Sequence, residues 1–251
     1  MALSAQAVAD VELPDSQPTA DSAEIEAAAR RLETAAPEDV LRWTVERFGS
    51  DVAVSCSFGG PSGIVLVDML ARLALLDQVD VYVVDTGLLF QETHALRAEV
   101  ERRYGFTATV FAPALNLEEQ AAAHGDALWT RDPNACCAMR RVAPNREALS
   151  RRGAWIAGLR RDQSPTRANT PVVAWNDRHD LVKVAPLANW TEAMVWNYVR
   201  RYDIPVNALH AQGYPSLGCT PCTTPARDGE DLRAGRWRGS DKTECGLHWQ
   251  I

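Results

Sequence analysis

Residues 51–63 read Asp-Val-Ala-Val-Ser-Cys-Ser-Phe-Gly-Gly-Pro-Ser-Gly, a short apolar run followed by a glycine-rich turn. The run over residues 51–55 is typical of a buried strand, and residues 62–76 have the apolar spacing of a helix. A glycine-rich turn at the start of a helix presents backbone N–H groups that can cradle an anion. The turn is neither a Walker A loop nor a Gly-x-Gly-x-x-Gly fingerprint, so turn geometry alone explains it equally well.

Strand and helix patterns alternate on both sides of this turn. Further strands are expected at residues 79–84, 107–111 and 155–157 and, as a pair at one edge of the sheet, at 172–175 and 181–184. Further helices are expected at residues 22–35, 37–48, 89–104 and, with Thr191 as N-cap, at 191–202. This alternation builds a mostly parallel sheet with helices on both faces, so the predicted fold class is α/β. From residue 203 onward Pro, Gly and Cys dominate, and regular structure should be sparse.

Composition excludes several classes of protein. Of 251 residues 46% are apolar, which is enough for a packed core, and the net charge of −7 argues against a general nucleic-acid binder. No apolar stretch is long enough to span a membrane, and the N-terminus lacks the basic start and apolar segment of a secretory signal. We therefore expect a soluble cytoplasmic protein without a nucleic-acid or membrane partner.

The chain divides into three parts. Residues 1–22 contain no Lys or Arg and are rich in Ala, Ser, Asp and Pro, which predicts a disordered acidic tail. Residues 23–240 form the expected single α/β domain. Residues 241–251 are polar, include a glycine, and are expected to be a mobile C-terminal segment that carries Cys245.

Positive charge is concentrated in residues 131–167, which hold nine arginines against three acidic residues. Such a run is often just a solvated face. In an acidic protein it also indicates a pocket for a compact polyanion, because guanidinium groups match phosphate or sulfate oxygens. Asp85-Thr86-Gly87 follows the second expected strand and should face the crevice at the carboxyl ends of the strands, although Asp85 equally suits a turn cap.

Four cysteines occur in two short pairs, Cys136-Cys137 and Cys219-Thr-Pro-Cys222. Four thiolates saturate one tetrahedral zinc ion or one iron–sulfur cluster, whereas Cys-x-x-Cys alone can be a redox dithiol. Adjacent cysteines are uncommon in zinc ribbons, so a cluster is favoured over zinc. Four unconnected buried thiols are the remaining reading.

The two other cysteines stand alone. Cys245 is close to Lys242 and His248, which would lower its pKa, and adjoins Glu244, which would oppose this. It is either a nucleophile on a movable segment or an incidental exposed thiol. Cys56, in the glycine-rich turn, is expected to be a small packed residue.

Together these motifs resemble the assimilatory adenylyl-sulfate (APS) reductases over residues 51–248. Besides the cysteine pairs, the resemblance rests on GLRRDQS at 158–164, GYPSLGC at 213–219, RAGRW at 233–237 and ECGLH at 244–248. It implies a Rossmann-like fold of the adenine-nucleotide α-hydrolase (PP-loop) type. It also implies a [4Fe-4S] cluster on Cys136, Cys137, Cys219 and Cys222.

The implied reaction converts APS and reduced thioredoxin to sulfite, AMP and oxidised thioredoxin. Cys245 would be the nucleophile and would carry an S-sulfocysteine intermediate. The resemblance assigns substrate binding to Ser55, Ser57, Phe58, Gly59, Gly60, Asp85, Thr86, Gly87, Arg141, Arg167, Arg233, Arg236 and His248. Arg141 stands where the family usually has a lysine, and Pro61-Ser62 interrupts the PP-loop pattern of ATP-cleaving relatives.

Three other functions compete with this reading. A PAPS reductase, or an enzyme that uses both nucleotides, shares the fold and the cysteine chemistry but generally lacks the four cluster cysteines. A tRNA-thiolating PP-loop ligase would need an intact ATP loop. A cluster- or zinc-bearing redox sensor would not need Cys245. The resemblance leaves open whether the protein is a homo-oligomer.

Overall fold

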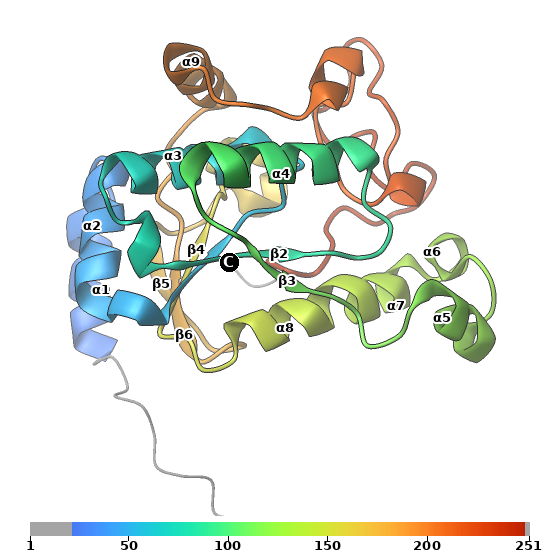
Figure 1. Ribbon diagram of the computed structural model, residues 1–251, viewed down its shortest axis with the longest axis horizontal. Helices are drawn as coiled ribbons and strands as arrows, with labels where there is room; N and C mark the ends of the chain where they lie inside the picture. Colours follow the sequence, from blue (N-terminus) through green and yellow to red (C-terminus); the bar gives the residue numbers. More distant parts are fainter. Residues whose placement is uncertain (1–21, 249–251) are drawn as a thin grey trace, which may run out of the picture.

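The structure, a computed structural model, describes residues 22–248 (Figure 1). The acidic tail expected at the N-terminus therefore lies outside the described residues, apart from Ser22, which begins a helix. A six-stranded sheet has the order β3-β2-β1-β4-β6-β5. Its strands are β1 (Val52–Ser55), β2 (Asp80–Val84), β3 (Thr109–Phe111), β4 (Ala154–Ala157), β5 (Val173–Asn176) and β6 (Leu181–Val184).

All neighbouring strands run parallel except β5 and β6, which form an antiparallel pair with β5 at the edge. The predicted mostly parallel sheet and its edge pair are thus confirmed. The central strands β1, β4 and β6 are buried almost throughout, as expected for strands covered on both faces.

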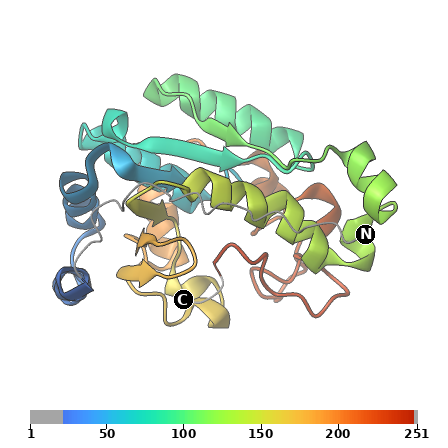
Figure 2. The same ribbon diagram turned by 90° about the horizontal axis from the view of Figure 1, so that it is seen from below.

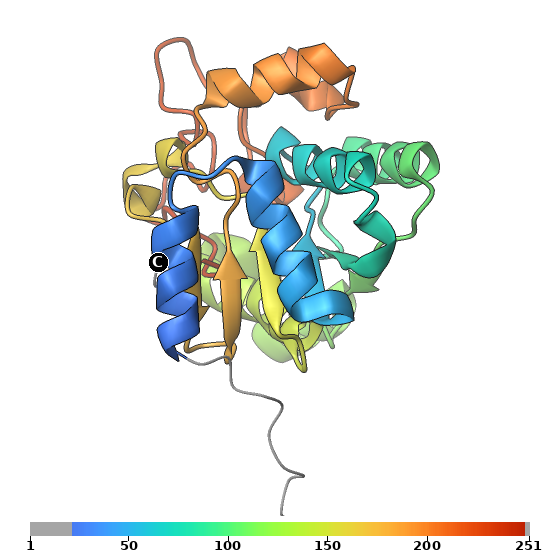
Figure 3. The ribbon, with the colours of Figure 1, turned by 90° about the vertical axis from the view of Figure 1, so that its left-hand side faces the viewer.

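Helices cover both faces of this sheet. Figure 2 shows α4 on one side of the strands and α8 on the other, and Figure 3 shows α1 and α2 side by side. The helices are α1 (Ser22–Leu32), α2 (Pro37–Phe48), α3 (Pro61–Arg72), α4 (Gln91–Tyr104), α5 (Leu117–His124), α6 (Leu128–Arg131), α7 (Pro133–Cys137), α8 (Ala143–Leu149) and α9 (Glu192–Tyr202). The Thr191 hydroxyl accepts a hydrogen bond from the Met194 backbone N–H, which confirms the predicted N-cap.

Helices α5 to α8 are absent from the expectations above. They are short, and α7 is joined to α8 by a π-helical segment (Ala138–Val142). Each has at most eight residues, which is too short for a 3.6-residue apolar repeat to be recognised. The capping box of α5 was the available signal: the Asn116 side chain accepts from the Glu119 backbone N–H, and the Glu119 carboxylate accepts from that of Asn116.

Between α9 and residue 248 the chain forms two short 3₁₀ turns, and it contains no α-helix and no strand of the sheet, as expected. Figure 1 shows this segment, coloured orange to red, at the end of the sheet where β2 stops. Backbone hydrogen bonds hold it there, including one from the Thr220 N–H to the Leu88 carbonyl. Within residues 22–248, no helix combines the length and apolarity needed to cross a membrane.

Candidate active site

A cavity of about 230 Å³ lies at the carboxyl ends of β1 and β4. Ligands of open α/β sheets bind at this edge, where neighbouring strands lead into separate loops. The loop after β1, the end of β4, α8 and the C-terminal segment all contribute to its walls. The predicted site residues that line it are Ser55, Ser57, Gly60, Arg141, Arg167, Arg233, Arg236, Cys245 and His248.

The glycine-rich turn forms one wall of this cavity and leads directly into α3. Gly158, which follows β4, packs tightly on it: a Cβ there would lie 3.0 Å from the Ser62 carbonyl carbon. Two predicted residues of the turn do not line the cavity. Phe58 is fully buried in the core, and Gly59 packs against Leu217.

The loop after β2 contacts the cysteines instead of lining this cavity. Asp85 accepts a hydrogen bond from the Gly87 backbone N–H (2.9 Å), which is the turn-cap role considered above. The Thr86 hydroxyl lies 3.3 Å from the Cys219 sulfur. The buried Arg140 guanidinium donates to the Thr86 carbonyl (2.6 Å) and so fixes the loop against the helix that carries Cys136 and Cys137.

The two cysteine pairs meet around a second, small cavity. It is lined by Cys136, Cys137, Cys219, Cys222, Leu88, Trp129, Pro133, Arg140, Arg141, Arg236 and Trp237. Burial raises the pKa of the Cys136, Cys137 and Cys222 thiols to about 11, and neighbouring thiols add to the effect. Among residues 22–248, no three His, Cys, Asp or Glu side chains converge closely enough to hold a single metal ion. The cavity is nevertheless lined by four thiols, with the guanidinium groups of Arg140, Arg141 and Arg236 beside them.

Cys245 lies between the two cavities. It lines the larger one and packs against Cys137 and Trp237. Burial raises the pKa of its thiol, but the Arg141 guanidinium, a backbone hydrogen bond from Leu247 and other cations outweigh burial and leave the pKa below its ordinary value. The site therefore favours a thiolate at a cysteine that is only 7% exposed.

Cations surround this sulfur. Arg236 is almost completely buried, its Nη1 donates to the Leu217 carbonyl (3.0 Å), and its Nε has no hydrogen-bond partner among residues 22–248. The guanidinium fits because Gly218 has no side chain, since a Cβ there would lie 2.1 Å from Arg236 Nη2. Arg141 Nε is also buried without a partner. Unpaired guanidinium atoms beside a cavity are suited to an anionic ligand.

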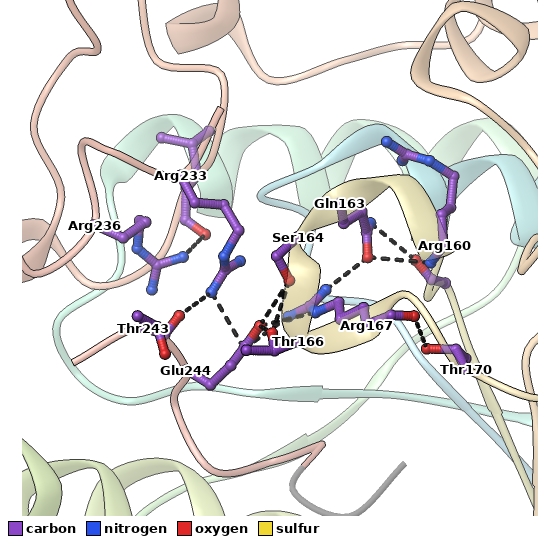
Figure 4. Close-up of polar contacts among 12 residues, drawn as sticks. Arg160, Gln163, Ser164, Thr166, Arg167, Thr170, Arg233, Arg236, Thr243 and Glu244 are labelled. Carbon is purple, nitrogen blue, oxygen red and sulfur yellow. Dashed lines mark hydrogen bonds and ion pairs between the residues drawn. The ribbon is translucent and has the colours of Figure 1, made fainter. Parts of the chain in front are cut away.

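Glu244 binds two of the predicted substrate arginines (Figure 4). Its carboxylate accepts hydrogen bonds from Arg167 Nε and Nη2, both at 2.9 Å, and from Arg233 Nη2 at 3.2 Å. Thr166 and Ser164 also donate to it. Burial raises the pKa of Glu244, but the arginines lower it by a larger amount, and the net effect is a pKa below the ordinary value. The carboxylate is therefore charged and attaches the C-terminal segment to the domain.

His248 stacks on Trp155, with ring centroids 5.2 Å apart and an angle of 19° between the planes. Burial and nearby cations keep the His248 pKa well below its ordinary value, so the imidazole is neutral. Trp155 was not among the predicted site residues, because an aromatic residue in a buried strand is typical of a core. Arg160 was also missed; it donates to the Ser62 hydroxyl (2.7 Å) and lines the cavity. Its place within GLRRDQS was the available signal.

Comparisons with known proteins agree with this geometry. Residues 51–225 match the phosphoadenosine phosphosulfate reductase domain family. A protein of Geobacillus thermodenitrificans named adenosine 5'-phosphosulfate reductase is 49% identical over 86% of this chain and 91% of its own length. Adenosine 5'-phosphosulfate reductase 1 of Bacillus subtilis is 49% identical over 83% of this chain and 89% of its own length.

Solved structures extend the similarity to the fold. The phosphoadenylyl-sulfate (PAPS) reductase of Candida auris, solved with phosphate, superposes with a TM-score of 0.72 at 27% identity, over 83% of this chain and all of that chain. FMN adenylyltransferase of Candida glabrata has a TM-score of 0.53 at 18% identity, over 86% of this chain and 74% of that chain, and shows a shared fold alone. The predicted PP-loop type of fold is confirmed, and the chain belongs to the phosphoadenosine phosphosulfate reductase family.

Proposed function

We propose that this protein reduces adenosine 5'-phosphosulfate to sulfite and AMP, with Cys245 as the nucleophile and thioredoxin as the electron donor. The observation that carries the proposal is the position of Cys245. A thiol with a lowered pKa lines a cavity that also exposes Arg141 and Arg236, and the glycine-rich turn forms the opposite wall. The names of the relatives that are 49% identical support the nucleotide assignment.

The cavity suits a nucleotide with two linked anionic groups. Ser57, Gly60 and the start of α3 are placed to receive the phosphate, because a helix N-terminus carries partial positive charge. Arg236 and Arg141 have unpaired donors for the sulfate oxygens. Arg167 and Arg233 form ion pairs with Glu244, and these pairs hold the segment that carries Cys245 in place.

In the first step, the Cys245 thiolate attacks the sulfate sulfur. An S–S bond forms, the S–O bond to the phosphate breaks, and AMP leaves with that electron pair, so that S-sulfocysteine remains. Thiolate and substrate are both anions. Arg141 and Arg236 reduce their repulsion and stabilise the charge that develops on the departing phosphate.

In the second step, a thioredoxin thiolate attacks the Cys245 sulfur and sulfite leaves with the electron pair of the S–S bond. The second thioredoxin thiol then resolves the mixed disulfide, so that the two electrons come from thioredoxin. Cys245 is 7% exposed, and a protein thiol does not reach a sulfur that is buried to this extent. The segment 241–248 must therefore leave its docked position, which is the mobility that the sequence predicts.

Cys136, Cys137, Cys219 and Cys222 would hold a [4Fe-4S] cluster in the smaller cavity. When bound, it supplies negative charge and rigidity beside Arg141 and Trp237, with no need to change its oxidation state. A cluster-loaded preparation should contain about four iron atoms per chain, and Cys222→Ser should lose them. All six cysteines are free thiols, which fits the reducing cytoplasm in which we place the protein.

Intact-protein mass spectrometry after anaerobic incubation with APS, without thioredoxin, tests the proposal. We expect a sulfo adduct that maps to Cys245, disappears with reduced thioredoxin and is absent from Cys245→Ser. A parallel incubation with PAPS separates an APS-specific enzyme from one that uses both nucleotides. Iron-containing protein that forms no adduct with either nucleotide would exclude the covalent mechanism and favour a redox sensor.

A further inference from the structure

Asn145 is a buried polar residue in the cavity wall that the mechanism above does not use. It lies in α8, four residues after Arg141 of the preceding π-helical segment, and both residues line the larger cavity. Its side chain is 2% exposed and lines the larger cavity together with Ser55, Trp155 and His248. Such burial of an amide is unfavourable unless both of its polar atoms find partners.

The orientation of this amide is determined by Tyr82. The Tyr82 hydroxyl, which is buried beneath the cavity, donates to Asn145 Oδ1 at 2.8 Å. A buried tyrosine proton requires an acceptor, so the carbonyl oxygen of the amide faces Tyr82 and the NH₂ group faces the opposite way. Asn145 Nδ2 makes no hydrogen bond to any residue from 22 to 248.

The neighbouring Ser55 hydroxyl is held by other groups. The Trp155 indole N–H donates to the Ser55 hydroxyl (2.9 Å), which in turn donates to the Ile156 carbonyl (3.2 Å). Neither bond involves the Asn145 amide. Asn145 Nδ2 is therefore a fixed neutral donor next to Arg141. It lines the same cavity as Cys245, so the sulfate group that Cys245 attacks must bind in this cavity.

We propose that Asn145 is a substrate-contacting residue whose Nδ2 donates a hydrogen bond to an anionic oxygen of the phosphosulfate group, with Tyr82 as the residue that positions it. This inference rests on the proposed function. Phosphosulfate oxygens accept hydrogen bonds and never donate them, so they match a donor whose alternative orientation is blocked. Two directional donors, the Arg141 guanidinium and the Asn145 amide, also define the position of a phosphosulfate oxygen more precisely than positive charge alone would.

Equilibrium binding of APS and of adenosine to the cluster-loaded protein tests the inference. Asn145→Leu keeps the size of the side chain and removes the donor, and it should weaken APS binding about 10-fold. Asn145→Asp places a carboxylate at the same position and should weaken APS binding about 100-fold. Adenosine, which lacks the anionic group, should bind all variants alike. Tyr82→Phe should weaken APS about 3-fold and should have no further effect in the Asn145→Leu background.

Tyr104→Phe is the matched control, because the Tyr104 hydroxyl donates to the Asp68 carboxylate (2.9 Å) away from the cavity. It should leave the APS affinity unchanged, and thermal unfolding shows whether each variant is folded. APS affinity that Asn145→Leu and Asn145→Asp both leave at the wild-type value would overturn the inference, as would an equal loss of adenosine binding. Wild-type protein that forms no Cys245 adduct would instead overturn the proposed function.

Discussion

The two sides of the larger cavity are held together by different forces. One side, which we call the sheet wall, comprises residues 55–63 and 155–160 and continues directly from β1 and β4, whose residues pair in a parallel ladder within the main core. The other side, the C-terminal strap, comprises residues 233–248 and has no helix or strand. The strap is attached by ion pairs and hydrogen bonds centred on Glu244, and by the apolar contacts of Trp237, Cys245 and His248.

This difference separates stability from closure. Apolar burial in the sheet wall is lost only when the domain unfolds, because strand and helix packing is cooperative. The strap is held by a few ion pairs, by a small apolar cluster separate from the main core and by the stacking of His248 on Trp155, and it can therefore open while the domain stays folded. A reaction that first encloses its nucleophile and then exposes it to a protein partner needs both properties.

The largest effect is expected at the strap itself. Cys245→Ser should lower sulfite formation at least about 10³-fold, because a serine hydroxyl is far less nucleophilic than a thiolate and should not form the covalent intermediate. The affinity for AMP should stay within about 2-fold of wild type, since a hydroxyl of similar size leaves the cation cluster in place. Sulfite release and equilibrium AMP binding measure the two quantities. Substantial residual turnover would show that the strap does not carry the nucleophile.

A core substitution should have the opposite signature. Leu66 in α3 is fully buried, and Leu66→Ala should lower the free energy of unfolding by about 2–5 kcal/mol. Chemical denaturation measures this loss. The rate at which iodoacetamide alkylates Cys245 in the folded protein should stay near the wild-type value. A large increase in that rate would mean that strap and core open together, and the proposed separation would be wrong.

Glu244→Gln should open the strap without unfolding the domain. Loss of its charge-assisted bonds to Arg167 and Arg233 should raise the alkylation rate of Cys245 about 10-fold and slow adduct formation to a similar extent. Glu24→Gln is the matched control, because Glu24 forms a two-bond pair with Arg47 between α1 and α2, outside the strap and the cavity. Equal effects of the two variants would show that general loss of charge, and not this contact, is responsible.

The same contact predicts a dependence on pH. Because the arginines lower the Glu244 pKa below its ordinary 4.5 despite the opposing effect of burial, the carboxylate stays charged throughout the neutral range. Its contribution to strap attachment is fully present above about pH 4.5 and is lost as the pH falls through the lowered value. Limited proteolysis of the strap at neutral and acidic pH should show opening only in acid, and Glu244→Gln should remove that difference.

The smallest effect is expected where charge is kept and shape changes. Arg141→Lys should slow formation of the Cys245 adduct about 3-fold, because a flexible ammonium keeps the positive charge but loses the planar fork. Arg141→Leu should slow it at least about 30-fold, since the thiolate loses its principal cation. Single-turnover adduct formation, followed by mass, distinguishes the two. Equal rates for Arg141→Lys and Arg141→Leu would show that charge at this position is unimportant.

The amino-acid sequence alone was sufficient for the alternating strands and helices, the pair of strands at one edge and the irregular C-terminal part, because apolar periodicity and caps such as Thr191 act over a few residues. The antiparallel direction of the edge pair came from the structure. The family was indicated by the resemblance of the two cysteine pairs and of the motifs at 158–164, 213–219, 233–237 and 244–248 to those of the APS reductases. The sequence did not predict the short helices α5 to α8, because most of them lack the length over which a periodic pattern can be recognised.

Tertiary structure decided which of these residues meet. It places Cys219 beside the loop after β2, sets Glu244 on Arg167 and Arg233, and turns the Asn145 amide toward the cavity through Tyr82. These contacts join positions that lie far apart in the chain. Crossover connections and core packing determine such distances, and neither leaves a local pattern in the sequence.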